Sequence, residues 1–392
     1  MHKIDVSKGQ LVSTVSEQWA NRPDDERFTS LTALHAQVAQ WAAESYTGEV
    51  APGQLVVDAV GDGGLRLMSA EGALDLNHYS FGQLANIAKA PANYLRSLPP
   101  ALAALNVNFG LKAAEQKPAS LYLRKPVVDL ADTDHAKRLL RGITSTKYGR
   151  ILDKDVVEAV MKVAGNGTGD TRWKVPGCID WSSSHGVSYN PNVVITKENT
   201  TLYASDRDIF LFLVDDMHPI EVGKLDDGSP DLMFRGFYVW NSEVGHRSFG
   251  VATMYLRGVC QNRNLWGVEG FSEVTFKHTS GAPDRFVEYA APALDTYAEG
   301  STVKLVEGVK AAKAAIVSKT NEERIEFLRK FGFSEKQAKA LIDVSIAEEG
   351  LPPSSLWDHA QAISAQARKA EFQEKRLHLE LIAGKVLDKV AV

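Results

Sequence analysis

A cysteine stands among amide and guanidinium side chains in the stretch LRGVCQNRNLWG, residues 256–267. The thiol could be a nucleophile or a metal ligand, and its polar neighbours could bind a polyanion. A nucleophilic cysteine needs a base and surroundings that favour the thiolate. Because the flanking charged residues are arginines, a catalytic Cys260 would need His246 or His278 to fold beside it. Unpaired cysteines at strand ends are usually small packing residues, so we assign no catalytic residue.

Metal and nucleotide motifs are weak in this chain. The ten histidines are scattered, whereas zinc and iron sites need closely spaced Cys, His or carboxylate groups. Acidic residues occur in the segments DRD (206–208) and DD (215–216). Acidic turn residues cap loops more often than they bind cations. GDGG and GNGTG lack the lysine and the strand-to-helix setting of a phosphate loop. We expect no metal, no cofactor and no nucleotide hydrolysis.

Polar and aromatic side chains gather at the expected ends of β-strands. Arg binds phosphate through a planar fork, and Asn and Gln both donate and accept hydrogen bonds. Aromatic rings offer stacking faces to single-stranded bases. The same side chains also tie loops to the backbone and fill cores, which leaves a structural role open. The predicted nucleic-acid-binding residues are Lys147, Tyr148, Arg150, Arg247, Arg257, Asn262, Arg263, Asn264, Trp266, Lys277 and His278.

Composition and charge narrow the class of protein. The 392 residues are 44% hydrophobic and 24% charged, which is typical of a folded globular chain. A net charge of -5 means that nucleic acid would have to bind at a local basic patch. Two cysteines cannot form the disulfide framework of a small secreted domain. The N-terminus lacks a signal-peptide core, and the run IFLFLV is too short to span a membrane. We expect a cytoplasmic protein with no membrane partner.

Apolar spacing and turn residues divide the chain into three expected regions. Residues 1–118 contain short helical stretches and a small β-meander. Residues 119–283 consist mostly of short β-runs separated by turn residues, as in an antiparallel sheet. Residues 284–392 have helical periodicity. We therefore predict an α+β fold, in which a mostly antiparallel β-sheet domain lies between a small N-terminal α/β segment and a helical C-terminal region.

Local signals predict several elements within these regions. MFRGFYVWNS and SFGVATMYLRGV flank EVGHR, whose Gly245 suits a tight turn, so they should be neighbouring strands. Capping-box patterns begin helices at Thr320 and Ser334. Apolar residues at steps of three and four predict one long helix over residues 354–390, packed on the domain or on another subunit.

Several blocks of the chain resemble phage- and plasmid-associated proteins grouped as domain of unknown function 932. The central blocks are RGITSTKYGRILDKDVVEAV, RGFYVWNSEVGHRSFGVATMYLRGVCQNRN and FKHTSGAPDRF. FGQLANIAKAPANYLRSLP and SSLWDHAQAISAQARKAEFQEKRLHLELIAG resemble the segments that flank the domain. The chain departs from the family at NSEVGHRS, where members often carry a Ser-His-Asp-Gly turn. The resemblance implies that the protein acts in the replication or recombination of mobile-element DNA. It implies no particular activity, because the family has no settled one.

Together these observations predict a DNA-handling accessory protein of a phage or mobile element, located in the host cytoplasm if phage-encoded. Its sharpest form is a homo-oligomeric, non-enzymatic protein that binds or anneals single-stranded DNA in replication or recombination. One alternative is a thiol- or metal-dependent enzyme that uses Cys260, His246 and His278. Another is a structural or interaction protein that binds no nucleic acid. Five cations discriminate between these classes: Lys147, Arg150, Arg257, Arg263 and Lys277. Their convergence on one exposed face would favour binding, and their scattering would favour the structural alternative.

Overall fold

The structure of the chain is a computed structural model. The described residues are 22–60, 64–70, 72–125, 138–169, 171–176, 179–180, 188–189, 194–225, 228–257, 263–264, 273–370 and 373–390. They form an α+β protein, as the sequence predicts, and their strands form two separate main sheets. None of the helices in these residues is long and apolar enough to cross a membrane.

The larger sheet is antiparallel and has the strand order β1-β11-β12-β14-β15-β16, with β8, β13 and β17 pairing beside this path. Its long central hairpin, β14 and β15, turns through Gly245 at φ +83°, which confirms the predicted pair of strands. A two-stranded ladder of β9 (Ile179–Asp180) and β10 (Ser188–Tyr189) is separate. The strands of the larger sheet are β1 (Arg27–Phe28), β8 (Trp173–Lys174), β11 (Leu202–Ala204), β12 (Ile209–Asp215), β13 (Ile220–Lys224), β14 (Pro230–Asn241), β15 (Phe249–Arg257), β16 (Arg263–Asn264) and β17 (Glu273–Phe276).

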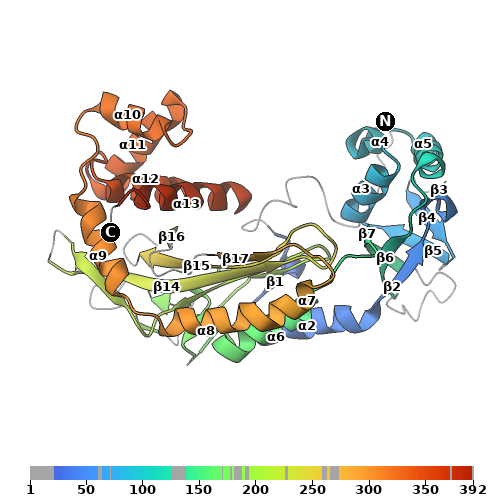
Figure 1. Cartoon of the computed structure of the whole chain (residues 1–392), viewed down its shortest axis with the longest axis horizontal. Helices are drawn as coiled ribbons and strands as arrows, with labels where there is room; N and C mark the ends of the chain where they lie inside the picture. Colours follow the sequence, from blue (N-terminus) through green and yellow to red (C-terminus); the bar gives the residue numbers. More distant parts are fainter. Residues whose placement is uncertain are drawn as a thin grey trace.

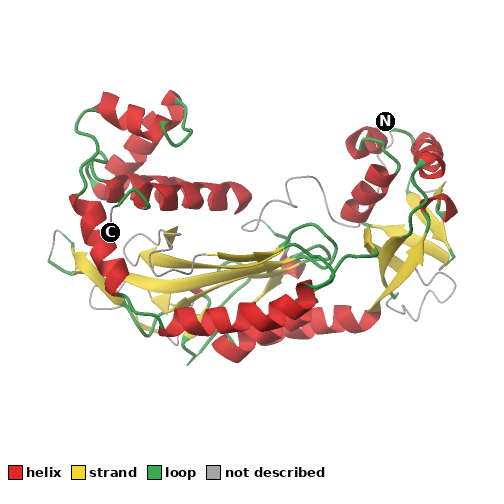
Figure 2. Ribbon diagram, in the orientation of Figure 1, coloured by secondary structure: helices red, strands yellow, loops and turns green. Residues whose placement is uncertain are grey.

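Helices α2 (Leu31–Glu44), α6 (Asp153–Ala164) and α8 (Ala291–Glu299) lie against one face of this sheet (Figure 2). Strand β12 is buried along its whole length. Alternate side chains of a strand point to opposite faces, so Ile209, Leu211 and Leu213 join the core under the helices. The intervening Phe210 and Phe212 join a separate aromatic cluster on the other face.

The smaller sheet has the order β2-β6-β7-β5-β4-β3, and its β5–β7 pair is parallel. Helices α3 (His78–Ile87), α4 (Ala92–Ser97) and α5 (Pro100–Ala113) share its core. The expected boundary at residue 118 therefore falls inside this unit, because β6 and β7 complete the sheet begun by the earlier strands. The strands are β2 (Ser45–Val50), β3 (Val56–Ala59), β4 (Leu65–Ser69), β5 (Gly72–Leu76), β6 (Ala119–Arg124) and β7 (Arg138–Ser145). Short 3-10 turns lie at Asp24–Glu26 and Pro52–Gln54.

The C-terminal region is helical. Side-chain caps begin α10 at Thr320 and α11 at Ser334, as predicted. The single long helix predicted for residues 354–390 is wrong: α12 and α13 pack on each other, which buries their apolar faces within the chain. The helices are α7 (Ala282–Arg285), a π-helical turn (Phe286–Ala290), α9 (Val303–Ala314), α10 (Asn321–Arg329), α11 (Glu335–Glu349), α12 (Leu356–Arg368) and α13 (Gln373–Leu387).

The molecule is elongated along the larger sheet. The smaller unit and the helices α10 to α13 stand on the same side of the sheet, at its two opposite ends (Figure 1). Helix α2 packs into the core of the larger sheet, the following residues form the smaller sheet with its three helices, and α6 packs into the core of the larger sheet again. The smaller unit and the unit built on the larger sheet therefore meet at the end of the larger sheet where β14 turns into β15.

Candidate functional site

The predicted binding residues divide between the two ends of β15. Lys277 and His278 follow β17, whose Phe276 pairs with Phe249 at the start of β15. Arg263 pairs with Leu256 at the other end. A nine-residue strand is about 30 Å long. The five cations Lys147, Arg150, Arg257, Arg263 and Lys277 therefore do not converge on one face, which favours a structural role for those at the Arg257 end.

Some of the predicted site cannot be placed. Asn262, Trp266 and Cys260 lie outside the described residues. Arg263 and Asn264 are placed only as the backbone of β16.

Arg257 belongs to an internal ion-pair network. Its Nε and Nη2 donate to the two carboxylate oxygens of Asp231 at 3.0 and 3.2 Å, and its Nη1 donates to Glu349 of α11 at 3.0 Å. Lys313 Nζ donates to the same Asp231 at 2.8 Å. The side chain of Arg257 is buried. Its prediction as a phosphate ligand is wrong, because its fork is already taken by carboxylates that fasten the sheet to the C-terminal helices.

Three loops meet at the opposite end of β15, and we call their joint surface the three-loop surface. The loops are residues 145–150, 242–248 and 277–281. The amide of Gly149 donates to the carbonyl of His278 at 3.1 Å, and His278 Nδ1 donates back to the Gly149 carbonyl at 3.0 Å. A Cβ at Gly149 would lie 1.8 Å from the carbonyl oxygen of Thr279. Glycine is thus required for this close approach.

An aromatic pair lies in the three-loop surface. The rings of Tyr148 and His278 are stacked, with centroids 4.8 Å apart and an interplanar angle of 20°. Tyr148 also donates its hydroxyl to the carbonyl of Ser242 at 2.7 Å, which holds the ring against the hairpin turn. Both rings are half-buried, and burial lowers the pKa of His278. Exposed Lys147 and Lys277 are their neighbours in the sequence.

Two predicted arginines near this surface make internal contacts. The guanidinium of Arg150 lies 3.8 Å from the ring centroid of Tyr122 and donates to the backbone carbonyl of Glu243. Arg247 Nε donates to Asp208 at 3.0 Å. The structure therefore brings Lys147, Tyr148, Arg150, Arg247, Lys277 and His278 together. Within this group, the two lysines are the exposed cations.

A buried carboxylate joins the two sheets beneath the three-loop surface. Glu243 Oε2 accepts hydrogen bonds from Arg141 at 2.6 Å and from the Tyr122 hydroxyl at 3.1 Å. Its Oε1 accepts from the backbone amide of Asp153 at 2.8 Å. Burial, with the nearby charge of Glu243, raises the pKa of Asp153 well above its usual range. The Asp153 carboxyl accepts a hydrogen bond from Asn241 Nδ2 at 2.7 Å.

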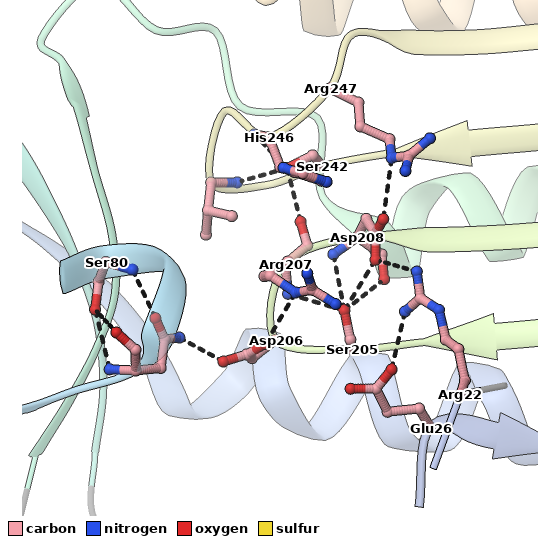
Figure 3. Close-up of polar contacts among 12 residues, drawn as sticks. Arg22, Glu26, Ser80, Ser205, Asp206, Arg207, Asp208, Ser242, His246 and Arg247 are labelled. Atoms are coloured by element: carbon pink, nitrogen blue, oxygen red, sulfur yellow. Dashed lines mark hydrogen bonds and ion pairs between the residues drawn. The ribbon is translucent and has the colours of Figure 1, made fainter. Parts of the chain in front are cut away.

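A second polar cluster surrounds the turn Ser205–Asp208 (Figure 3). Asp208 accepts from Arg22 at 2.6 Å and from Arg247 at 3.0 Å. Burial alone would raise the pKa of Asp208, but these two guanidinium groups hold it well below its usual range. Asn77, which caps α3, donates to Asp206. This cluster fastens the smaller unit to the larger sheet.

The two histidines named in the enzyme alternative make separate aromatic contacts. The ring of His246 packs edge-on against Tyr79, with centroids 5.2 Å apart. Burial lowers the pKa of His246 to about 4. His278 stacks instead on Tyr148. Within the described part of the chain, no group of three or more His, Cys, Asp or Glu residues could hold a metal ion.

Sequence reasoning missed Glu243, Arg141 and Asp153 as the centre of the junction. The predicted turn EVGHR contains Glu243, but an acidic residue in a polar turn usually faces solvent. Its partner Arg141 lies 102 residues earlier. Comparisons with protein families, with curated proteins and with solved structures find no match to this chain.

Proposed function

We propose that the protein binds single-stranded nucleic acid at the three-loop surface. The observation that carries the proposal is the stacked pair of Tyr148 and His278 next to exposed Lys147 and Lys277. Aromatic faces accept bases of any sequence, and ammonium groups neutralise the phosphates between them. The combination suits a strand whose bases are unpaired.

The proposal assigns different roles to the cations of this region. Arg150 and Arg247 hold the loops in place through Glu243 and Asp208. Lys147 and Lys277 then supply the contacts with phosphate. A protein of net charge -5 needs such a local patch to hold a polyanion. The finer context, handling of phage or mobile-element DNA in replication or recombination, rests on the sequence resemblance.

The test is a salt titration of binding to a fluorescent single-stranded oligonucleotide, followed by anisotropy. Lys147→Ala and Lys277→Ala should each reduce the slope of log affinity against log salt by about 0.7, because each removes one phosphate contact with a single strand. Lys162→Ala is the matched control, since this exposed lysine of α6 pairs with Glu158 at 3.3 Å. Its slope should equal that of the wild type.

Circular dichroism must show that each variant is folded. An unchanged slope in both surface variants would reject the three-loop surface as the binding site. Absence of binding to single-stranded DNA or RNA by folded wild-type protein at low salt would reject the proposed function.

A further inference from the structure

Helix α5 presents a large apolar stripe to solvent. Its buried side packs into the core of the smaller unit through Ala103, Ala104, Val107 and Leu111. On the outer side, Leu102, Leu105 and Phe109 are 49%, 66% and 78% exposed. Residues at this spacing lie on one face of a helix. Tyr94 of the neighbouring α4 is also exposed. A grouped apolar surface of this kind marks an interaction site.

The three helices of the smaller unit carry only positive charges, and the exposed Glu115 that follows them pairs with Lys117 at 2.7 Å. Residues 78–114, which cover the three helices of the smaller unit, contain Lys89, Arg96 and Lys112 and no Asp or Glu. Exposed Lys112 follows Phe109 by three residues, so it borders the stripe. A complementary partner should therefore present apolar side chains beside carboxylates.

A surface of that chemistry lies at the end of α11 in the same chain. Ile346 is 45% exposed and Leu351 is 70% exposed. The left-handed Gly350 ends the helix, with its amide donating to the Ile346 carbonyl at 3.1 Å, so Leu351 follows directly on the turn. Exposed Asp343 precedes Ile346 by three residues and lies on the same face.

The two surfaces lie at opposite ends of the molecule (Figure 1). One copy therefore cannot close this contact on itself. Pairing of α5 with α5 of a second copy would bring together two helical layers of the same positive charge, which is unfavourable. A contact between different surfaces of identical chains is heterologous and extends into an open chain unless its rotation closes a ring.

We propose that the protein self-associates head to tail, with the α5 stripe of one copy docking on the α11 end of the next. The contact uses Leu102, Leu105 and Phe109 on one side and Ile346 and Leu351 on the other. Lys112 then lies close to the carboxylate of Asp343 in the neighbouring copy. This inference is independent of nucleic-acid binding, because the association needs no ligand.

The test is sedimentation velocity of the full chain without nucleic acid, at protein concentrations up to about 100 μM, where a small interface is populated. The wild type should form dimers and longer species as its concentration rises. Leu105→Asp and Leu351→Asp should each weaken association at least about thirtyfold, as loss of a central apolar contact does. Val303→Asp, which adds the same charge at an exposed apolar site at the start of α9, should associate like the wild type.

A mixture of the two defective variants separates head-to-tail pairing from other modes. Leu105→Asp retains the α11 end and Leu351→Asp retains the α5 stripe, so the mixture should form dimers and stop there. A wild type that stays monomeric would overturn the proposal. So would a Leu351→Asp variant that still associates alone, or a mixture of folded variants that forms no dimer.

Discussion

Glu243 shows how much one side chain can organise in this protein. Its carboxylate contacts Arg141 and Tyr122 of the smaller sheet and the amide of Asp153 at the start of α6. All of these groups are buried. A buried charge is tolerated only when it is paired and hydrogen-bonded. The stability of this junction therefore depends on the complete set of contacts.

We predict that Glu243→Gln lowers the free energy of unfolding by roughly 3 to 5 kcal/mol, because it leaves the Arg141 guanidinium buried without its counter-charge. Urea denaturation measures this change. Glu158→Gln is the control, since this exposed carboxylate pairs with Lys162 on the surface and should cost less than about 1 kcal/mol. Equal stability of the two variants would show that the buried pair is dispensable.

At the scale of single residues, the sequence identified the side chains of the three-loop surface by type. Lys147 and Lys277 are exposed, as a role in binding requires. Arg257 is not exposed, because its carboxylate partner Asp231 lies 26 residues earlier on the adjoining strand and pairs with it in the interior. The guanidinium group of arginine presents the same N–H donors to a phosphate as to a buried carboxylate, so the residue type alone does not distinguish the two roles.

Among the elements, α12 carries a buried histidine that responds to pH. The ring of His359 lies 4.6 Å from that of Phe327, and its Nε2 is 2.9 Å from the Ser318 hydroxyl. Burial lowers the pKa of His359 to about 4, and the neighbouring charges are Asp358 and Arg324. The C-terminal helices therefore fold around a neutral imidazole.

We predict that acid destabilises these helices through His359. Above the unfolded pKa of about 6.5 the imidazole is neutral in both states, and the full stability is present. As the pH falls from about 6.5 towards 4, the unfolded chain binds the proton first, so the free energy of unfolding decreases by roughly 2 kcal/mol between pH 7 and pH 5. Urea denaturation at both pH values measures the decrease.

His359→Asn is the diagnostic variant for this pH dependence. It should lose the roughly 2 kcal/mol that His359 contributes to the difference in stability between the two pH values. His246 and His78, whose pKa values burial also lowers to about 4, supply further contributions. An identical pH dependence in folded His359→Asn protein would contradict the assignment.

At the scale of the whole molecule, Gln83 of α3 bridges the two units. Its Nε2 donates to the carbonyl of Val244 in the hairpin turn at 2.8 Å. Its Oε1 accepts from the amide of Ile143 in β7 at 2.7 Å. The contact between the units is thus largely polar, in contrast to the separate apolar core of each unit. Such an interface permits one unit to open before the other.

We predict that Gln83→Ala increases hydrogen exchange in β4 and β5 of the smaller sheet while β12 of the larger sheet stays protected. The variant removes the hydrogen bond to Val244 between the units and the hydrogen bond to Ile143 within the smaller unit, and it leaves each apolar core intact. Exchange measured by mass spectrometry tests this, with Gln40→Ala as the control, because Gln40 bonds only Glu44 on the exposed side of α2 in the contacts described. Equal acceleration in both sheets would mean that the units unfold together.

Local sequence patterns were enough to predict the features that depend on neighbouring residues. The Thr320 and Ser334 caps begin the predicted helices, and Gly245 lies in the turn between the two predicted strands. Two features became visible only in the folded chain: β6 and β7 join the smaller sheet, and Arg257 is buried far from Lys277. The local patterns do not predict them, because caps and periodicity act over a few residues. Strand pairing and ion pairing are decided instead by contacts between residues far apart in the chain, whose partners no local pattern specifies.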